Sequence, residues 1–376
     1  MKRILNIVNS LDTGAVENWL VRACEAVAAK NPDWKWTFYC TYGQRGRLDD
    51  RASQFGAQVV YSPHPVGNKR SFFLSLRAFL RSHHHDILHC HHDIMSAAYL
   101  WSAVGIPFRR RIVHVHNNQA ELPTPSRWKR LLLREPMRQT CLRFADRVVG
   151  VSQHTLAAFL KNEAPQPPRD RVLYCGIDAQ RFRVETDPAA FRREMGLSAS
   201  ARILLFAGRM VPLKNPLFVV NMMKTLAHLD ASIVACFVGT GELEEKVARL
   251  AQEMSISGRI RLLGWRDDLA RIMKASNLLV FPNIEEVKEG LGLVVVEAQA
   301  AGLPMLVSQG VSEEAIVVPG LSQILQLATG PQHWARRAMK TLAMPIPDRR
   351  ASLSQIENSA FSIGNSSAGL MALYEN

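Results

Sequence analysis

Residues 289–304 read EGLGLVVVEAQAAGLP, and this stretch decides the fold that the sequence predicts. It opens with a glycine-rich turn at Gly290-Leu291-Gly292 and continues as a helical run. Gly302 and Pro304 end that helix and lead into an apolar run, Met305-Leu306-Val307. Such a turn points free backbone N–H groups and the positive end of a helix at whatever lies in front of it. The stretch therefore predicts a strand–loop–helix–strand unit with an anion site at its loop.

Two carboxylates border this predicted anion site. Glu289 lies before the helix, and Glu297 lies within its first turns, eight positions later. They can therefore contact different parts of one ligand. The pattern favours a ligand with a phosphate in the middle and hydroxyls at both ends, which is the shape of a nucleotide sugar.

Size and composition are those of a soluble two-domain protein. A length of 376 residues predicts two domains, and 47% hydrophobic with 21% charged residues is ordinary for globular chains. No apolar run reaches the roughly 18 to 20 residues that span a bilayer. The N-terminal segment MKRILNIVNSLD is too short and polar for a signal peptide and is expected to be a first buried strand. Six scattered cysteines without a CxxC pair indicate a reducing compartment, so we expect a cytoplasmic protein.

The chain is strongly basic, with a formal net charge of +13. Between Phe108 and Arg147, ten Arg or Lys residues stand against three acidic ones. Such a balance indicates nucleic acid, an anionic membrane surface or anionic substrates as partners. A nucleic-acid-binding protein would interleave stacking aromatics with its cations, but aromatic residues make up only 7% of the chain. We therefore expect no nucleic-acid partner.

Strands and helices alternate along the whole sequence, which predicts α/β architecture with a parallel, doubly wound sheet in each half. A proline-rich loop at 163–169 comes near the end of the first half, and the pattern restarts after Gly176-Ile177-Asp178. We expect domains at 1–175 and 176–360, with the terminal helix in 361–376 crossing back to the first domain. Strands are expected at 4–8, 37–42, 59–61, 87–91, 111–116, 147–151, 172–174, 203–207, 233–238, 260–263, 278–281 and 305–307, and helices include 72–80, 127–134 and 137–145, the last two separated or kinked by Pro136.

Cations and glycines follow the first strands of the second half. Arg209 and Lys214 lie in a strand-to-helix loop with Gly208, at the edge where such sheets bind ligands. Two cations there can neutralise a diphosphate, although an ordinary solvated loop would look similar. Gly239-Thr240-Gly241 ends the next strand and is weak evidence by itself. The chain has no Asp-x-Asp, which commonly holds a diphosphate through a metal, so we expect neither a metal nor a cofactor.

The first half offers fewer candidates. Gly14 lies where a strand end meets a helix, which suits either close approach of a ligand or a simple turn. His114 and His116 share one face of their strand, and His116, nearer the strand end, is the better candidate for ligand contact. His114 is expected to be a satisfied core histidine, and the run at 83–85 is expected to be a polar turn rather than a metal site.

Together these segments resemble the family-4 retaining glycosyltransferases of the GT-B fold, especially those of exopolysaccharide and capsule assembly. The most specific match is the pair Glu289 and Glu297 followed by Ala298–Pro304, the E-x7-E motif with its EAxAxGxP continuation. Supporting matches are Gly208-Arg209 with Lys214-Asn215, Gly239-Thr240-Gly241, 263–268 (LGWRDD), 114–117 (HVHN), 175–178 (CGID, with Cys for the family's Asn) and 14–17 (GAVE, with Ala for the family's second Gly).

The resemblance implies two Rossmann-like domains facing a cleft, with the acceptor on the first domain and the nucleotide-sugar donor on the second. Arg209 and Lys214 would bind the donor diphosphate and stabilise the leaving group. Glu289 would bind sugar hydroxyls, Glu297 would hold the ribose, and His116 would contact the sugar near the reacting carbon. The implied catalytic residues are His116, Arg209, Lys214 and Glu289, without an enzymic nucleophile. The implied donor site comprises Gly14, Gly208, Arg209, Lys214, Gly239, Gly241, Gly290, Leu291, Gly292, Leu293 and Glu297.

The resemblance also implies partners: a nucleotide-sugar donor and a saccharide or lipid-linked saccharide acceptor in the synthesis of a cell-surface polysaccharide such as exopolysaccharide, capsule or lipopolysaccharide. The basic first half would hold such an enzyme peripherally on the anionic inner face of the cytoplasmic membrane, at about 1 kcal/mol per Lys or Arg near the surface. The main alternative is an enzyme of the same fold that epimerises or hydrolyses a nucleotide sugar.

Overall fold

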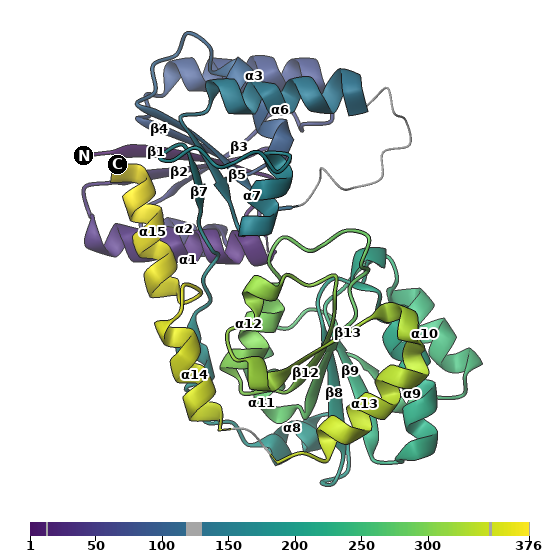
Figure 1. Cartoon of the computed structure of the whole chain (residues 1–376). Helices are drawn as coiled ribbons and strands as arrows, with labels where there is room; N and C mark the ends of the chain where they lie inside the picture. Colours follow the sequence, from purple (N-terminus) through teal and green to yellow (C-terminus); the bar gives the residue numbers. More distant parts are fainter. Residues whose placement is uncertain (13, 118–129, 346–347, 376) are drawn as a thin grey trace. The chain divides into compact units, whose positions relative to one another are not determined.

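The structure, a computed structural model, describes residues 1–12, 14–117, 130–345 and 348–375. The chain divides into two compact units (Figure 1). Unit 1 comprises Met1–Gly176 together with Ile363–Asn376, and unit 2 comprises Ile177–Ser362. Each unit is built on one parallel sheet, as the alternating pattern predicted.

The sheet of unit 1 has seven strands in the order β3-β2-β1-β4-β5-β6-β7, and the paired strands run parallel. The chain moves outward from β1 in one direction, then returns to β4 and moves outward in the other. The order therefore reverses between β1 and β4, which is where such sheets form a ligand crevice. The strands are β1 (Arg3–Val8), β2 (Lys35–Cys40), β3 (Gln58–Tyr61), β4 (Ile87–Cys90), β5 (Arg110–Val115), β6 (Arg147–Gly150) and β7 (Asp170–Val172).

Helices cover both faces of this sheet (Figure 1). Side chains of one face, among them Leu5, Leu88 and Val113, form a buried core with α3, α4, α6 and α7. The opposite face meets α1 and α15, which pack against each other. The helices are α1 (Ala15–Lys30), α2 (Asp49–Gln54), α3 (Lys69–Ser82), α4 (Ser96–Ser102), α6 (Glu135–Phe144), α7 (Gln153–Phe159) and α15 (Ile363–Glu375).

The terminal helix α15 is part of unit 1 although it follows unit 2 in the sequence. The Trp19 indole N–H donates a 2.7 Å hydrogen bond to Ser366 Oγ, and that hydroxyl donates to the Tyr174 carbonyl at 2.6 Å. Trp19 is 1% exposed. A buried indole N–H needs a partner, so α15 completes the core on this face.

The sheet of unit 2 has six strands in the order β10-β9-β8-β11-β12-β13, again paired in parallel. Here the order reverses between β8 and β11. One face packs on α9, α10 and α13, and α8, α11, α12 and α14 belong to the other layer. The elements are β8 (Arg202–Ala207), β9 (Ile233–Val238), β10 (Ile260–Leu262), β11 (Leu278–Phe281), β12 (Met305–Ser308), β13 (Ser322–Leu325), α8 (Pro188–Glu194), α9 (Pro216–Leu229), α10 (Glu244–Glu253), α11 (Leu269–Ala275), α12 (Leu293–Ala300), α13 (Gly330–Leu342) and α14 (Arg349–Asn358).

Pro136 was expected to separate or kink two helical pieces, and the structure shows no separation. A π-helical turn at Arg130–Arg134 leads directly into α6, and Pro136 occupies the first turn of that helix. Pro136 has no N–H to donate to the preceding turn, and the wider π-helical turn accommodates the missing donor. The start of the helix expected at 127–134 lies outside the described residues. Among the described residues, no helix has the length and apolar character needed to cross a membrane.

Candidate functional site

The loops after β8 and β11 meet at the reversal point of the unit 2 sheet. These strands are direct neighbours, with Leu204 beside Leu278 and Leu205 beside Leu279. A Cβ atom on Gly208, just past β8, would lie 3.6 Å from the ring of Phe281, the last residue of β11. The sheet therefore brings the cationic loop that follows β8 next to the EGLGL segment that follows β11.

Lys214 and Glu289 form an ion pair at this edge. Lys214 is 8% exposed, and its ammonium lies 4.6 Å from the centre of the Phe281 ring. Burial lowers the pKa of Lys214, and the charge of Glu289 opposes that shift. The second carboxylate oxygen of Glu289 accepts a hydrogen bond from the side chain of Asn283, which is fully buried. Two residues that the sequence placed in separate roles are thus directly coupled.

Glycines hold the loops after β8 and β9 in backbone contact. Gly239 has a φ of +119°, and a Cβ atom there would lie 2.1 Å from the Gly208 carbonyl oxygen. The Met210 amide donates to the Thr240 carbonyl at 2.9 Å. A Cβ atom on Gly241 would lie 2.5 Å from the Met210 carbonyl oxygen. These positions require glycine for close packing, which fixes the backbone that carries the exposed side chain of Arg209.

The glycine-rich turn leads into α12 as predicted. Gly292 has a φ of +81° and immediately precedes the first helical residue, Leu293. The Glu289 amide donates to the Gly310 carbonyl at 2.9 Å, which ties the turn to the loop after β12. Glu297 is half-buried in the second turn of α12. The amino end of α12 therefore presents backbone N–H groups beside the Lys214–Glu289 pair, an arrangement that binds anions.

In unit 1, His116 lies one residue past β5 and is 6% exposed. Its backbone amide donates to Asp93 Oδ1 at 2.6 Å, and the amide of Asn117 donates to the same oxygen at 3.3 Å. The Asn117 side chain donates to Asp93 Oδ2 at 3.2 Å. Burial raises the pKa of Asp93 to about 6, although these hydrogen bonds favour its ionised form. Asp93 thereby holds the end of β5 in place.

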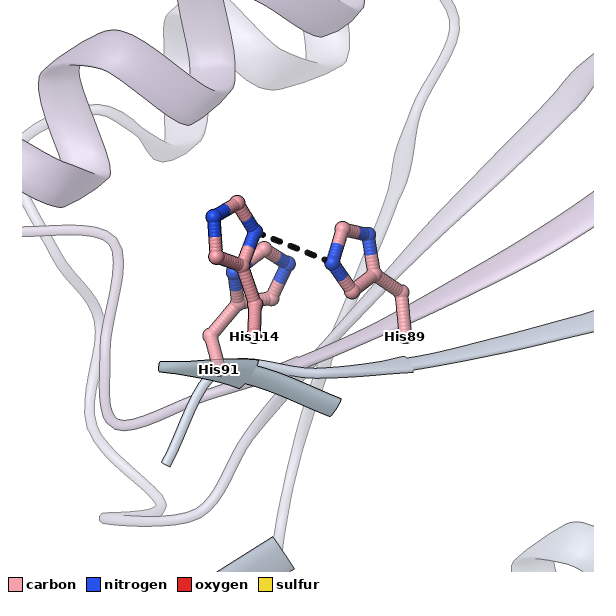
Figure 2. Close-up of side chains that lie close together, drawn as sticks. All are labelled: His89, His91 and His114. Carbon is pink, nitrogen blue, oxygen red and sulfur yellow. Dashed lines mark hydrogen bonds between the residues drawn. The ribbon is translucent and has the colours of Figure 1, made fainter. Parts of the chain in front are cut away.

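His89, His91 and His114, at the ends of β4 and β5, form one buried cluster (Figure 2), and His116 lies beside it. His89 Nε2 lies 3.2 Å from His114 Nδ1, and His91 Nδ1 lies 3.0 Å from His116 Nε2. Burial lowers the pKa of all four imidazoles, that of His116 to about 3. His114 is fully buried as expected, but its Nε2 has no hydrogen-bond partner among the residues that the structure describes, so the core histidine is only half satisfied.

The structure also describes two other segments of unit 1 for which the sequence made a prediction, Gly14 and residues 83–85. Gly14 caps α1 with an extended backbone, φ −64°, that any residue can adopt. Among the described residues, the nearest atoms to a Cβ there are those of the Glu17 carboxylate, the far end of a flexible side chain. The histidine run at 83–85 is not wholly a polar turn, because His85 is 5% exposed and its Nε2 lies 3.1 Å from Thr37 Oγ1.

Two family descriptions match the chain in tandem. "Glycosyltransferase Family 4" matches residues 16–181, and "Glycosyl transferases group 1" matches residues 189–358. The chain is a family 4 glycosyltransferase. The family that the sequence motifs resemble is therefore confirmed.

Curated relatives of this glycosyltransferase agree with that assignment. It is 29% identical over 262 residues to the D-inositol 3-phosphate glycosyltransferase of Mycolicibacterium gilvum, covering 67% of this chain and 57% of the relative. It is 28% identical over 269 residues to the UDP-Gal:alpha-D-GlcNAc-diphosphoundecaprenol alpha-1,3-galactosyltransferase of Escherichia coli, covering 69% of this chain and 67% of the relative. It is 22% identical over 358 residues to the putative glycosyltransferase EpsF of Bacillus subtilis, covering 93% and 90%. The first of these matches thus spans little more than half of the relative's length.

Solved structures show the fold. Anabaena HepE, determined in complex with UDP-glucose, superposes with a TM-score of 0.78 at 16% identity, covering 100% of this chain and 99% of that chain. The predicted GT-B architecture is confirmed.

The glycosyltransferase carries two site features that sequence reasoning missed. Asn283, which binds Glu289, and Asp93, which binds the His116 segment, both follow a strand at the reversal point of their sheet. Their position just after these strands was the signal in the sequence that could have identified them as site residues. Of the predicted catalytic and donor-site residues, the structure brings Gly208, Lys214, Gly239, Glu289 and Gly292 together in unit 2, whereas Gly14 and His116 belong to unit 1.

Proposed function

We propose that this glycosyltransferase moves a sugar from a nucleotide-sugar donor to a saccharide acceptor with retention of the anomeric configuration. The observation that carries the proposal is the ion pair between buried Lys214 and half-buried Glu289, which lies beside the amino end of α12. A cation and helix N–H groups suit a diphosphate, and a carboxylate suits sugar hydroxyls. That the structure of HepE contains UDP-glucose supports this class of donor.

The reaction builds negative charge on the departing diphosphate. Positioned cations and N–H donors stabilise developing charge without reorganising, which is commonly the largest contribution to catalysis. Lys214 and exposed Arg209 would supply the charge, and the backbone at 290–293 would supply N–H groups. Glu289 would keep Lys214 in position and accept hydrogen bonds from the sugar, and Glu297 would hold the ribose. We propose that the transfer needs no divalent metal, because these groups would neutralise the diphosphate charge that a metal ion otherwise neutralises.

In unit 1, we propose that His116 contacts the sugar near the reacting carbon and that the Gly14 loop lines the ligand site. The backbone amides of His116 and Asn117 donate hydrogen bonds to Asp93, which fixes the end of the strand at His116. A fixed strand end supports this role, because a misplacement of about 1 Å can cost a hundredfold in rate.

A lipid-linked saccharide is the proposed acceptor, and cell-surface polysaccharide synthesis is the proposed pathway. The E. coli relative acts, by its name, on a diphosphoundecaprenol-linked sugar, and EpsF supports the exopolysaccharide class. Helix α3 supports a location at a membrane, because its exposed side carries Arg70, Leu74 and Arg81 and the helix contains no acidic residue. Leu74 is 63% exposed. Such a face suits an anionic bilayer surface.

A screen of nucleotide sugars by thermal shift identifies the donor, because a ligand that binds only the folded state raises its apparent stability. Transfer from that donor to a lipid-linked acceptor is then measured for Lys214→Ala. We expect loss of transfer with the fold intact, whereas Lys224→Ala, an exposed lysine of the same unit, should behave as the wild type. Near-normal turnover of Lys214→Ala would refute the proposed site.

The same assay without acceptor tests the alternative. An epimerase or hydrolase forms product from the nucleotide sugar alone, whereas a transferase requires the acceptor. For membrane association, co-sedimentation with anionic liposomes should weaken with salt and in the Leu74→Ser variant. Binding that depends on neither anionic lipid nor salt would contradict that part of the proposal.

A further inference from the structure

The four strand-end histidines lie on one face of the unit 1 sheet. Successive side chains of a strand point to opposite faces, so His89 and His91 share a face, as do His114 and His116. Strands β4 and β5 are paired with Cys90 beside Val113, which places His91 next to His114. The opposite face carries the apolar core with α3 and α4. The histidines therefore gather on the side of α1 and α15, where Trp19 contacts His114 edge-on at 5.5 Å.

Three of these side chains have the geometry of a metal site. One ring nitrogen from each of His89, His91 and His114 lies within 4.8 Å of the other two, and all three residues are buried (Figure 2). Tetrahedral zinc with bonds of about 2.0–2.1 Å places its ligand nitrogens about 3.4 Å apart. The 3.2 Å between His89 Nε2 and His114 Nδ1 already matches one such edge. The other separations need to shorten by at most about 1.4 Å to complete the site.

Two of the imidazoles have an oxygen atom near the ring nitrogen that would not bind the ion. His89 Nδ1 lies 2.8 Å from the Tyr374 hydroxyl, and His91 Nε2 lies 3.2 Å from Asn6 Oδ1. The Tyr374 hydroxyl donates to the same Asn6 oxygen at 3.4 Å. Both histidines can thus donate one N–H to an oxygen and keep the other nitrogen unprotonated. Metal-binding histidines are oriented in this way.

We propose that His89, His91 and His114 bind a transition-metal ion in the core of unit 1, with zinc as the ion that neutral imidazoles and a tetrahedral site favour. The fourth position falls to His116, whose Nε2 lies 3.0 Å from His91 Nδ1. All four ligands are then protein side chains, which makes the site structural. It joins β4 to β5 and, through Tyr374, to α15. The site is separate from the diphosphate site of unit 2. His116 would bind the ion through Nε2 and keep Nδ1, which has no hydrogen-bond partner among the described residues, for the proposed sugar contact.

Metal analysis of the full chain, purified without a histidine tag from zinc-supplemented cells and dialysed, tests the site. We expect about one zinc per chain in the wild type and its loss in His89→Gln, which keeps a polar group near Tyr374 but removes a ligand. The matched control is His85→Gln, another buried histidine of unit 1 outside the cluster, which should retain the metal. Zinc retained equally by both variants would overturn the proposal.

A second measurement decides the matter if His89→Gln fails to fold. The wild-type chain, stripped with a chelator, is titrated with Co²⁺ and its visible spectrum recorded. The intense d–d bands of tetrahedral cobalt, displaced by added zinc, would support the site. A wild-type chain that retains no metal and gives only the spectrum of hydrated cobalt would overturn it, and the imidazoles would then simply hydrogen-bond one another. Neither readout uses a sugar substrate, so its outcome is independent of the proposed function.

Discussion

The coupling between Lys214 and Glu289 can be measured as a free energy. The two side chains are 10% and 19% exposed, so the pair is largely withdrawn from solvent. Removing one partner of a buried pair costs about 3–5 kcal/mol, because the other charge is left uncompensated. Since both groups keep some exposure, we take the lower end, about 3 kcal/mol, for Glu289→Gln and for Lys214→Met. Glu289→Gln should also lower the pKa of Lys214 further, because the carboxylate now opposes the effect of burial.

The double variant Lys214→Met/Glu289→Gln leaves no charge unpaired. We expect it to be destabilised by about 2 kcal/mol less than the sum of the single variants, which is within the range for residues in direct contact. Hydrogen exchange followed in peptides of β8 and α12 reports the free energy of opening for unit 2 alone. A mutant cycle that is additive within about 0.5 kcal/mol would refute the conclusion that these two residues act as one pair.

Two further predictions concern stability. Acidification should destabilise unit 1 through His85, because burial lowers the pKa of this imidazole to about 4. As the pH falls below about 6.5, the unfolded chain binds a proton at His85 before the folded chain does. The free energy of unfolding should therefore fall by about 3 kcal/mol by pH 4. Denaturation at pH 7 and pH 4.5 should show a smaller loss for His85→Gln, and an unchanged loss would contradict the reasoning. Gly239→Ala should destabilise unit 2 by about 3 kcal/mol or more, because its Cβ meets the Gly208 carbonyl oxygen and its φ is positive. The control is Gly196→Ala, where φ is +63° and a Cβ atom would meet no described atom within 4 Å. It should cost only about 1–2 kcal/mol, and equal losses in the two variants would show that the contact at Gly239 is unimportant.

Local patterns in the sequence were sufficient to predict the architecture. Alternating apolar strands and helices identified the doubly wound sheets, because buried parallel strands appear as short apolar runs. The EGLGL turn was predictable as a helix start, since its glycines allow the φ of +81° found at Gly292. Strand β13, Ser322–Leu325, was missed because it is an edge strand of mixed polarity, with two exposed or half-buried polar residues and no continuous apolar run.

Contacts between distant segments were not predictable. Lys214 and Glu289 are 75 positions apart, and their pairing depends on β8 lying beside β11 rather than on any local pattern. The histidine cluster arises in the same way, because the register of β4 and β5 sets which imidazoles meet. Individual residues could therefore be nominated from the sequence, but the pairs that they form required the order of the strands.

Helix α15 has a consequence for how the chain is made. Unit 1 consists of two pieces of sequence with all of Ile177–Ser362 between them, and Ser366 and Tyr374 come from the second piece. At a synthesis rate of about 5–20 residues per second, a ribosome needs roughly 10 to 40 seconds to add the intervening residues. Throughout that time the nascent first half lacks the helix that covers Trp19. The half that is translated first is thus the half that is finished last, and a short C-terminal truncation should expose it to chaperones and proteases.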